Sequence, residues 1–167
     1  SVRLCLKKDN VIGVVSKRFG QYENKALVQL VRRAINGWRV STTDYNMTNE
    51  CMDVSMVFED LYVDSIHHPP RKIHMGLHLR NSEVGYASTQ VVPTIHDPVM
   101  GYKIAFGEFI LKCTDQRQVA RFVHVGNREP EIIEHVEQLI SHLMSEYKTI
   151  LQFYLRTCEY STTVATL

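Results

Sequence analysis

The sequence contains few of the residues that define several protein classes. Its 167 residues hold eight glycines and five prolines, too few for a collagen-like or low-complexity chain. Its cysteines are widely spaced, without the two-residue spacing of a zinc knuckle or a redox motif. This favours reduced thiols in an intracellular protein, although the even count also permits two disulfides. The cysteines are Cys5, Cys51, Cys113 and Cys158.

Long apolar runs and catalytic signatures are also absent from the sequence. No stretch approaches the about 18 uncharged apolar residues of a membrane-spanning helix, and residues 1–10 do not resemble a secretory signal. There is no GxSxG, HExxH or P-loop motif. We therefore predict no spanning segment, no enzymatic activity and no cofactor. The length is typical of one globular domain, expected to occupy residues 1–167 with a frayed tail at 157–167.

The charges are unevenly distributed along a chain whose net charge is only +1. Residues 1–40 hold nine Lys or Arg and two acids, whereas residues 41–66 hold six acids and no Lys or Arg. Residues 67–128 have a net charge of +4, and residues 129–167 of −4. A basic face attracts phosphates or anionic lipid, and blocks of opposite sign favour contacts between copies. Alternatively, the blocks neutralise one another as ordinary surface ion pairs within the fold.

The periodicity of apolar residues predicts an α+β fold. Apolar residues three and four apart indicate an amphipathic helix over residues 22–38 and a long helix from 129 to about 156. Residues 41–51 are polar and are interpreted as a loop. Pro93 suggests an edge strand. Alternation and β-branched residues predict strands at 2–6, 11–15, 52–66, 73–80, 86–95, 102–114 and 119–125. This order predicts an antiparallel sheet of about five strands with both helices packed on it.

Four histidines lie within twelve residues and raise the question of a metal site: His67, His68, His74 and His78. On a strand, His74 and His78 share a face, and a returning turn would bring one of the other two close. However, Pro69-Pro70 separates the two pairs, and the polar face of a strand commonly carries such residues without a ligand. We predict no metal site, although the sequence alone leaves this cluster open.

The basic residues of the first third are the candidate contact site. They form one surface if the first strands and the first helix lie together, and seven or more cations hold a protein reversibly at an anionic membrane. Phe19 and Tyr22 lie among them but are better explained as core residues, so specific nucleic-acid recognition is not expected. The basic residues are Lys7, Lys8, Lys17, Arg18, Lys25, Arg32, Arg33 and Arg39. The last four are expected to act as one patch.

The order of these elements resembles the globular part of rhabdovirus matrix proteins. The resemblance covers most of the chain and rests on element order and pattern. Because plant-infecting members are shorter, the resemblance would suit a compact member of that group. Such proteins usually carry a lysine-rich N-terminal tail with a Pro-Pro-x-Tyr motif, whereas Pro69-Pro70 here is followed by Arg71-Lys72. The matching stretches are VIGVVSKRFGQYENKALVQLVRRAINGW, MDVSMVFEDLYV, RKIHMGLHLR, ASTQVVPTI, YKIAFGEFILKCTD, VARFVHVGN and EPEIIEHVEQLISHLM.

The resemblance implies a non-enzymatic virion protein that self-associates between the anionic inner leaflet and the viral nucleocapsid during assembly and budding. Its expected locations are the virion, the host cytoplasm, the inner face of host membranes and the nucleus. The basic residues would contact lipid or nucleocapsid, and an acidic block would face a neighbouring copy. The acidic residues are Asp44, Glu50, Asp53, Glu59, Asp60 and Asp64. The alternative is an intracellular host adaptor domain that binds a partner protein through its sheet and the Ile133–Tyr154 stripe of the long helix.

Overall fold

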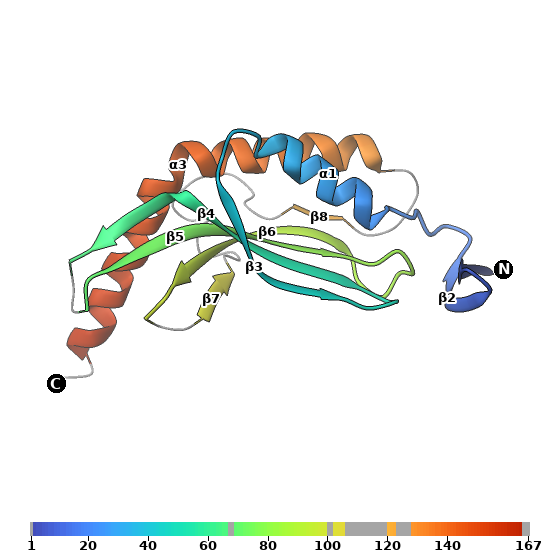
Figure 1. Cartoon of the computed structure of the whole chain (residues 1–167), viewed down its shortest axis with the longest axis horizontal. Coiled ribbons are helices and arrows are strands. Elements are labelled where there is room, and N and C mark those ends of the chain that lie inside the picture. Colours follow the sequence, from blue (N-terminus) through green and yellow to red (C-terminus); the bar gives the residue numbers. More distant parts are fainter. Residues whose placement is uncertain (1, 67–68, 100–101, 106–119, 123–127, 165–167) are drawn as a thin grey trace.

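The computed structural model describes residues 2–66, 69–99 and 128–158 in full, and the backbone of 102–105, 120–122 and 159–164 (Figure 1). The elements, in chain order, are β1 (Val2–Lys7), β2 (Asn10–Ser16), α1 (Asn24–Ala34), β3 (Val40–Met47), β4 (Met52–Ser65), β5 (Arg71–Asn81), β6 (Thr89–Asp97), β7 (Tyr102–Ala105), β8 (Ala120–Phe122) and α3 (Glu129–Val164). Several residues discussed above lie outside the described part: His67, His68, Cys113 and the expected strand residues 106–114, 119 and 123–125.

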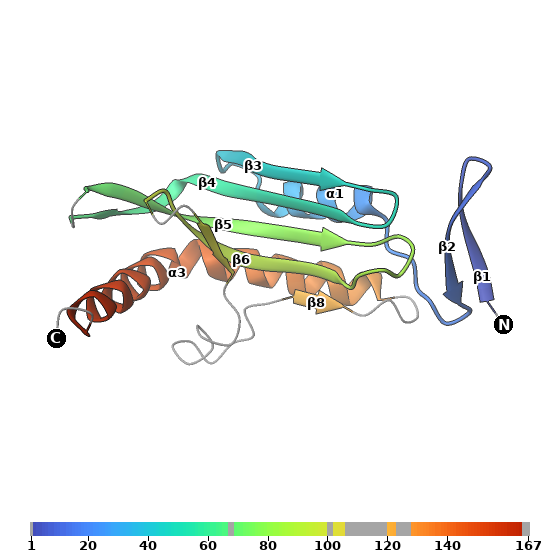
Figure 2. The same cartoon turned by 90° about the horizontal axis from the view of Figure 1, so that it is seen from below.

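The strands form two separate antiparallel sheets. β1 and β2 pair with each other as a hairpin. In the main sheet β3, β4, β5 and β6 are neighbours in that order, and the short strands β7 and β8 both pair with β6. Both helices lie on one face of the main sheet (Figures 1 and 2). The predicted mixed α+β class, the antiparallel strands and the long C-terminal helix are confirmed. The main sheet has four long and two short strands, where the sequence suggested about five.

Pro93 does not mark an edge strand, because β6 is paired along both of its sides. On one side, β5 pairs with β6 through the whole segment that contains Pro93. On the other side, β8 pairs with residues 89–91 and β7 with residues 94–97. Pro93 therefore falls in the gap between these two short partners. Among the described residues none pairs with Pro93 on that side, so a residue without a backbone N–H is tolerated there.

The segment interpreted as a loop, residues 41–51, begins with a strand. β3 pairs with β4 in an antiparallel ladder that starts at the pair Val40–Phe58 and ends at Met47–Met52. All residues of β3 except Val40 are exposed. A strand that buries almost none of its side chains needs no apolar alternation, so the pattern that identifies strands was missing from this segment.

α1 is shorter than the segment 22–38 that the periodicity marks. Leu27, Leu30 and Val31 are buried on its inner side. Beyond the helix end, Gly37 adopts a φ of 90°, and the following Trp38 side chain is 38% exposed. A positive φ is readily adopted by glycine just after a helix. The chain therefore turns before Trp38 can join the buried stripe.

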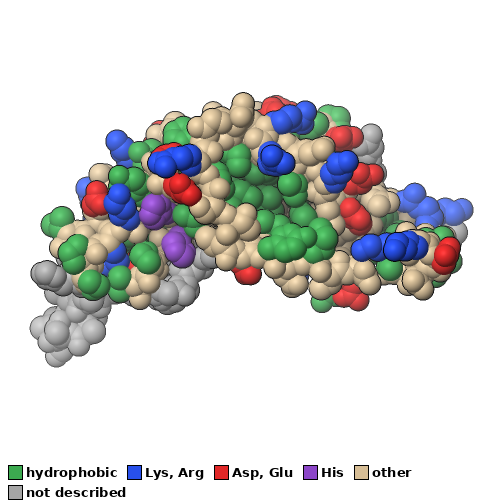
Figure 3. Space-filling view, viewed as in Figure 1, with side chains coloured by type: hydrophobic (Ala, Val, Ile, Leu, Met, Phe, Trp, Pro, Cys, Tyr) green, Lys and Arg blue, Asp and Glu red, His purple; other side chains and the backbone are tan. Residues whose placement is uncertain are grey.

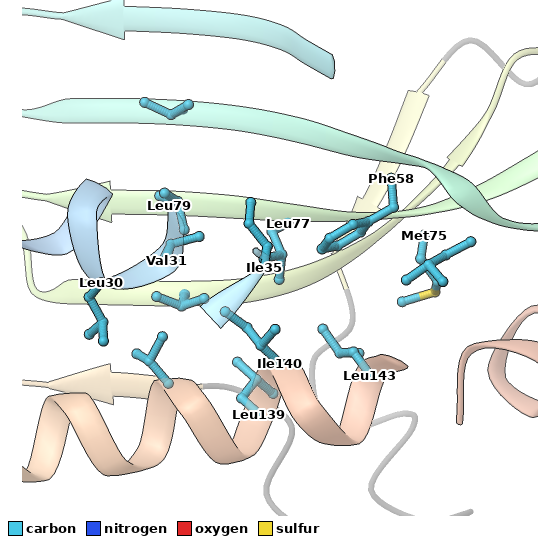
Figure 4. Close-up of a cluster of buried hydrophobic side chains, with 14 of the residues drawn as sticks. Leu30, Val31, Ile35, Phe58, Met75, Leu77, Leu79, Leu139, Ile140 and Leu143 are labelled. Atoms are coloured by element: carbon cyan, nitrogen blue, oxygen red, sulfur yellow. The ribbon is translucent and has the colours of Figure 1, made fainter. Parts of the chain in front are cut away.

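The main core lies between the sheet and the two helices, where side chains from all these elements meet (Figure 4). α3 continues through Val164, so residues 157–164 are helical, contrary to the expected frayed tail. The helix is held beyond residue 150 because Leu151 and Tyr154 are buried and Leu155 and Cys158 pack against the core. In the view of Figure 1 this last part of α3 turns down past the end of the sheet.

Candidate surface-contact site

The β1–β2 hairpin is attached to the rest of the chain through its inner face. Val15 is buried on this face, and a Cβ placed on Gly13 would lie 2.7 Å from the Cβ of Val84. The guanidinium of Arg3 also donates a hydrogen bond to the carbonyl of Phe19. These contacts hold the hairpin at one end of the molecule, while the C-terminus lies at the opposite end (Figures 1 and 2).

The outer face of the hairpin is apolar and open to solvent. The cross-strand pairs Leu4–Val14 and Leu6–Val11 lie on this face, because side chains alternate between the two faces of a strand. Its apolar side chains are between 56% and 64% exposed. They are Val2, Leu4, Leu6, Val11 and Val14. We name this set the outer hairpin face. The sequence predicted the two strands but not which side of the hairpin would stay uncovered.

Three of the expected cations, Lys8, Lys17 and Arg18, lie at the two ends of the hairpin. Lys8 occupies the turn between β1 and β2 with a φ of 56°, a conformation that side chains other than Asn and Asp rarely adopt. Lys17 and Arg18 directly follow β2. All three are exposed, and within the described part of the chain none has a carboxylate at ion-pair distance. We call them the hairpin cations. Their charge is therefore available to an external anion.

Three further cations, Lys7, Lys25 and Arg32, line one groove of about 580 Å³ between α1 and the adjoining ends of β3 and β4. Figure 3 shows hydrophobic side chains gathered in this area with Lys and Arg around them. Glu50 and Glu83 line the same groove, so its charge is mixed. The apolar lining consists of Ile12, Val28, Tyr45, Met47 and Met52.

The remaining two cations do not join the groove, so the expected four-residue patch is not assembled. Arg33 lines a separate hollow beside α3. Arg39 lies next to the acidic block of its own chain, with its Nε 3.2 Å from both carboxylate oxygens of Asp60 and its Nη1 3.7 Å from Glu59. The hydrogen bonds from Arg39 hold the pKa of Asp60 below its usual value. The charge of Arg39 is thus largely neutralised within the molecule.

The six acidic residues expected at contacts between copies fall into two groups. Glu59 and Asp60 pair with Arg39, and Asp53 lies 3.3 Å from His78 Nε2 and 3.6 Å from Arg80 Nε. The other three are exposed and, among the residues that the structure describes, take part in no ion pair: Asp44, Glu50 and Asp64. Only these three keep an unbalanced negative charge.

The two described histidines of the cluster, His74 and His78, each contact the neighbouring strand β4. His74 Nδ1 lies 3.1 Å from the carbonyl oxygen of Phe58, and His78 Nδ1 lies 3.0 Å from Ser55 Oγ. His78 also lies near Asp53, so Ser55, His78 and Asp53 have the residue types of a hydrolase triad. Such a triad needs an accessible serine, whereas Ser55 is only 6% exposed. Over the described residues, no group of three or more His, Cys, Asp or Glu is placed to hold a metal ion.

A buried ion pair that the sequence did not reveal joins β5, β6 and α3. The guanidinium of Arg71 donates two hydrogen bonds to the Asp97 carboxylate, at 2.8 and 2.9 Å. The Tyr154 hydroxyl donates to the same carboxylate at 3.2 Å. Burial raises the pKa of Tyr154, and Cys158 and Asp97 raise it further, so the hydroxyl remains a donor. Because Asp97 is fully buried, we assign this cluster a structural role.

No known protein family, curated protein or solved structure matches this chain. None of the helices in the described part has the length and apolarity that crossing a membrane requires.

Proposed function

We propose that this chain is a non-enzymatic structural protein with a role like that of rhabdovirus matrix proteins. It binds an anionic membrane surface and the viral nucleocapsid, and it associates with its own copies during assembly and budding. The observation that carries the proposal is that the hairpin cations have no carboxylate partner in the described chain. Such charges contribute about 1 kcal/mol each near an anionic membrane, in a salt-dependent way.

The charge distribution supports the second part of the proposal, association between copies. Counting only partners in the part of the chain that the structure describes, unpaired cations lie on the hairpin and unpaired acids at Asp44 on β3 and Asp64 on β4. A positive surface of one copy can therefore meet a negative surface of the next. Such a contact is heterologous, and it forms an open polymer where the rotation between copies does not close a ring.

The adaptor alternative loses one of its two expected surfaces, the long helix. The stripe of α3 that was expected to bind a partner helix is buried against the chain's own sheet and α1, with Val136, Ile140 and Leu143 at most 1% exposed. A partner could reach it only if the core opened. For this reason we favour the surface-binding function over an adaptor that acts through α3.

Reversing the hairpin cations is expected to abolish binding to anionic vesicles. The variant Lys8→Glu/Lys17→Glu/Arg18→Glu loses three favourable charges and gains three unfavourable ones. A loss of about 3 kcal/mol in binding free energy lowers the membrane partition coefficient by at least about 100-fold. Sedimentation with phosphatidylserine-containing vesicles at 0.1 and 0.5 M salt measures this. The wild-type chain should bind at the lower salt concentration and be released at the higher one.

The matched control reverses three exposed cations at or in α3, Arg128→Glu/Lys148→Glu/Arg156→Glu. Both triple variants have the same net charge, so any difference between them reports the position of the charges rather than their sum. We expect the control to bind within about threefold of wild type, since distant exposed charges are screened. Equal losses in the two variants would show that the hairpin is not the contact site.

Reversing the unpaired acids is expected to weaken self-association. In Asp44→Lys/Asp64→Lys, two surface contacts of about 0–1 kcal/mol become repulsive, which predicts roughly tenfold weaker association. Sedimentation velocity over a concentration series at low salt measures the change. Glu134→Lys/Glu137→Lys on α3 is the control with the same change in net charge. A wild-type chain that stays monomeric throughout would contradict the self-association part of the proposal.

A further inference from the structure

The outer hairpin face is a concentrated exposed apolar surface on the described chain. Five apolar side chains stand next to one another, each more than half exposed, on a two-stranded sheet. By contrast, Leu77 and Leu79 on β5 are fully buried under the helices. An isolated two-stranded hairpin is only marginally stable in water. A surface of this kind normally marks a site of interaction.

The hairpin cannot cover this face by turning it towards the main body. Its inner face already packs against the rest of the chain, since Gly13 and Val15 lie beside Val84 and Gly85. The Arg3 guanidinium also donates a hydrogen bond to the backbone carbonyl of Phe19. Rotating the hairpin would break these contacts, including the close approach of Gly13 to Val84, which leaves no room for a Cβ. The outer face therefore needs an occupant from outside the described chain.

The charges around this face identify the chemistry of the occupant. The segment Val2–Arg18 holds five Lys or Arg and one Asp, a net charge of +4. Two such hairpins placed face to face would bring like charges together, which disfavours a second copy's hairpin. An anionic bilayer offers acyl chains to the apolar side chains and phosphates to the hairpin cations. This combination of an apolar face with flanking Lys and Arg is typical of segments that lie in a membrane interface.

We propose that the outer hairpin face inserts into the interfacial region of an anionic membrane while the hairpin cations contact lipid phosphates. This proposal rests on the membrane-binding function proposed above and adds an apolar component to it. β1 and β2 have six and seven residues, fewer than the about 9–11 that a membrane-spanning strand needs. The hairpin therefore lies in the interface and does not cross the bilayer.

The test uses tryptophan as a probe of depth. The chain has one tryptophan, so Trp38→Phe supplies a background in which Leu4→Trp reports on the outer hairpin face and Tyr45→Trp on exposed β3. Vesicles of phosphatidylserine and brominated phosphatidylcholine quench only fluorophores that enter the acyl region. We expect at least twofold quenching of the tryptophan at position 4 and none at position 45.

A second arm measures how much the apolar residues contribute. Leu4→Thr/Leu6→Thr/Val14→Thr keeps strand-forming residues and should weaken vesicle binding by about 10-fold to 100-fold. The binding that remains should be released by 0.5 M salt. The control Ile66→Thr/Val99→Thr/Phe153→Thr removes exposed apolar residues outside the hairpin and the groove and should bind like wild type. Circular dichroism verifies that both variants are folded.

The outcomes separate this inference from the function on which it rests. Wild-type affinity in the hairpin threonine variant, together with no quenching at position 4, would mean a purely electrostatic contact. That result would overturn the insertion and leave the proposed function standing. A change in oligomeric state without a change in vesicle binding would assign the face to a second copy and also overturn the insertion. If the wild-type chain binds no vesicles at all, both proposals are wrong.

Discussion

Replacing Asp97 by alanine is expected to lower the free energy of unfolding by about 3–5 kcal/mol, because it leaves the Arg71 guanidinium buried without its counter-charge. The Arg71 side chain is 12% exposed and that of Asp97 is fully buried, so water replaces the lost carboxylate only in part. The substitution also removes the acceptor of the Tyr154 hydroxyl, which ties α3 to the sheet. Urea denaturation followed by circular dichroism measures the loss.

Two further variants test this explanation. Tyr154→Phe removes the hydroxyl that donates to Asp97 and interacts with Cys158, and it should cost only about 1–2 kcal/mol. Arg71→Met/Asp97→Leu removes both charges together and should be more stable than Asp97→Ala alone, since no unpaired ion remains in the interior. A double variant that is less stable than Asp97→Ala would contradict this explanation. The unpaired charge of Arg71 would then not be the cause of the lost stability.

Replacing Gly76 by alanine is expected to destabilise the main sheet by about 3 kcal/mol, the upper end of the usual range for overpacking. A Cβ at this position would lie 2.5 Å from the carbonyl oxygen of Met56 and 2.6 Å from Thr94 Oγ1. Met56 belongs to β4 and Thr94 to β6. The added methyl group therefore pushes both strands that flank β5 away from it. Thermal and urea unfolding measure the effect.

The glycine that follows α1 is the control for this substitution. No heavy atom lies within 4 Å of a Cβ placed on Gly37, so Gly37→Ala costs only the strain of its positive φ, about 1 kcal/mol. Adding Thr94→Ala to Gly76→Ala removes one of the two close contacts and should restore part of the lost stability. The restoration is only partial because the contact with the Met56 carbonyl remains. Complete restoration would contradict the proposed backbone contact.

The charge blocks could be predicted from the sequence, but the pairing of individual charges could not. The reading as ordinary surface ion pairs holds for one part of the chain, whereas the reading as contact surfaces stays a prediction. Arg39 and Asp60 form an ordinary ion pair at the surface and neutralise each other's charge. Lys8 and Asp64 remain without ion-pair partners in the described chain. Which charges pair depends on how the turn before β3 is placed beside β4, and residue counts along the chain contain no information on that placement.

Elements with one buried face could be predicted because burial imposes a period on the sequence. In β5 the buried Ile73, Met75, Leu77 and Leu79 alternate with two half-buried histidines and a glycine, and α3 repeats its apolar residues every three or four positions. β3 could not be predicted, since it buries almost nothing. The role of Pro93 was misjudged because the ends of β7 and β8 are set by pairings distant in the sequence.

The sequence by itself determined the class of the fold, the two N-terminal strands and the excess of positive charge in the first 40 residues. These properties are local, because they follow from the order of neighbouring residues along one strand or helix. Only the tertiary structure decided that Arg39 is neutralised, that Arg71 and Asp97 meet in the interior, and that the outer hairpin face stays uncovered. Each of these depends on contacts between segments far apart in the chain, and sequence periodicity does not specify such contacts.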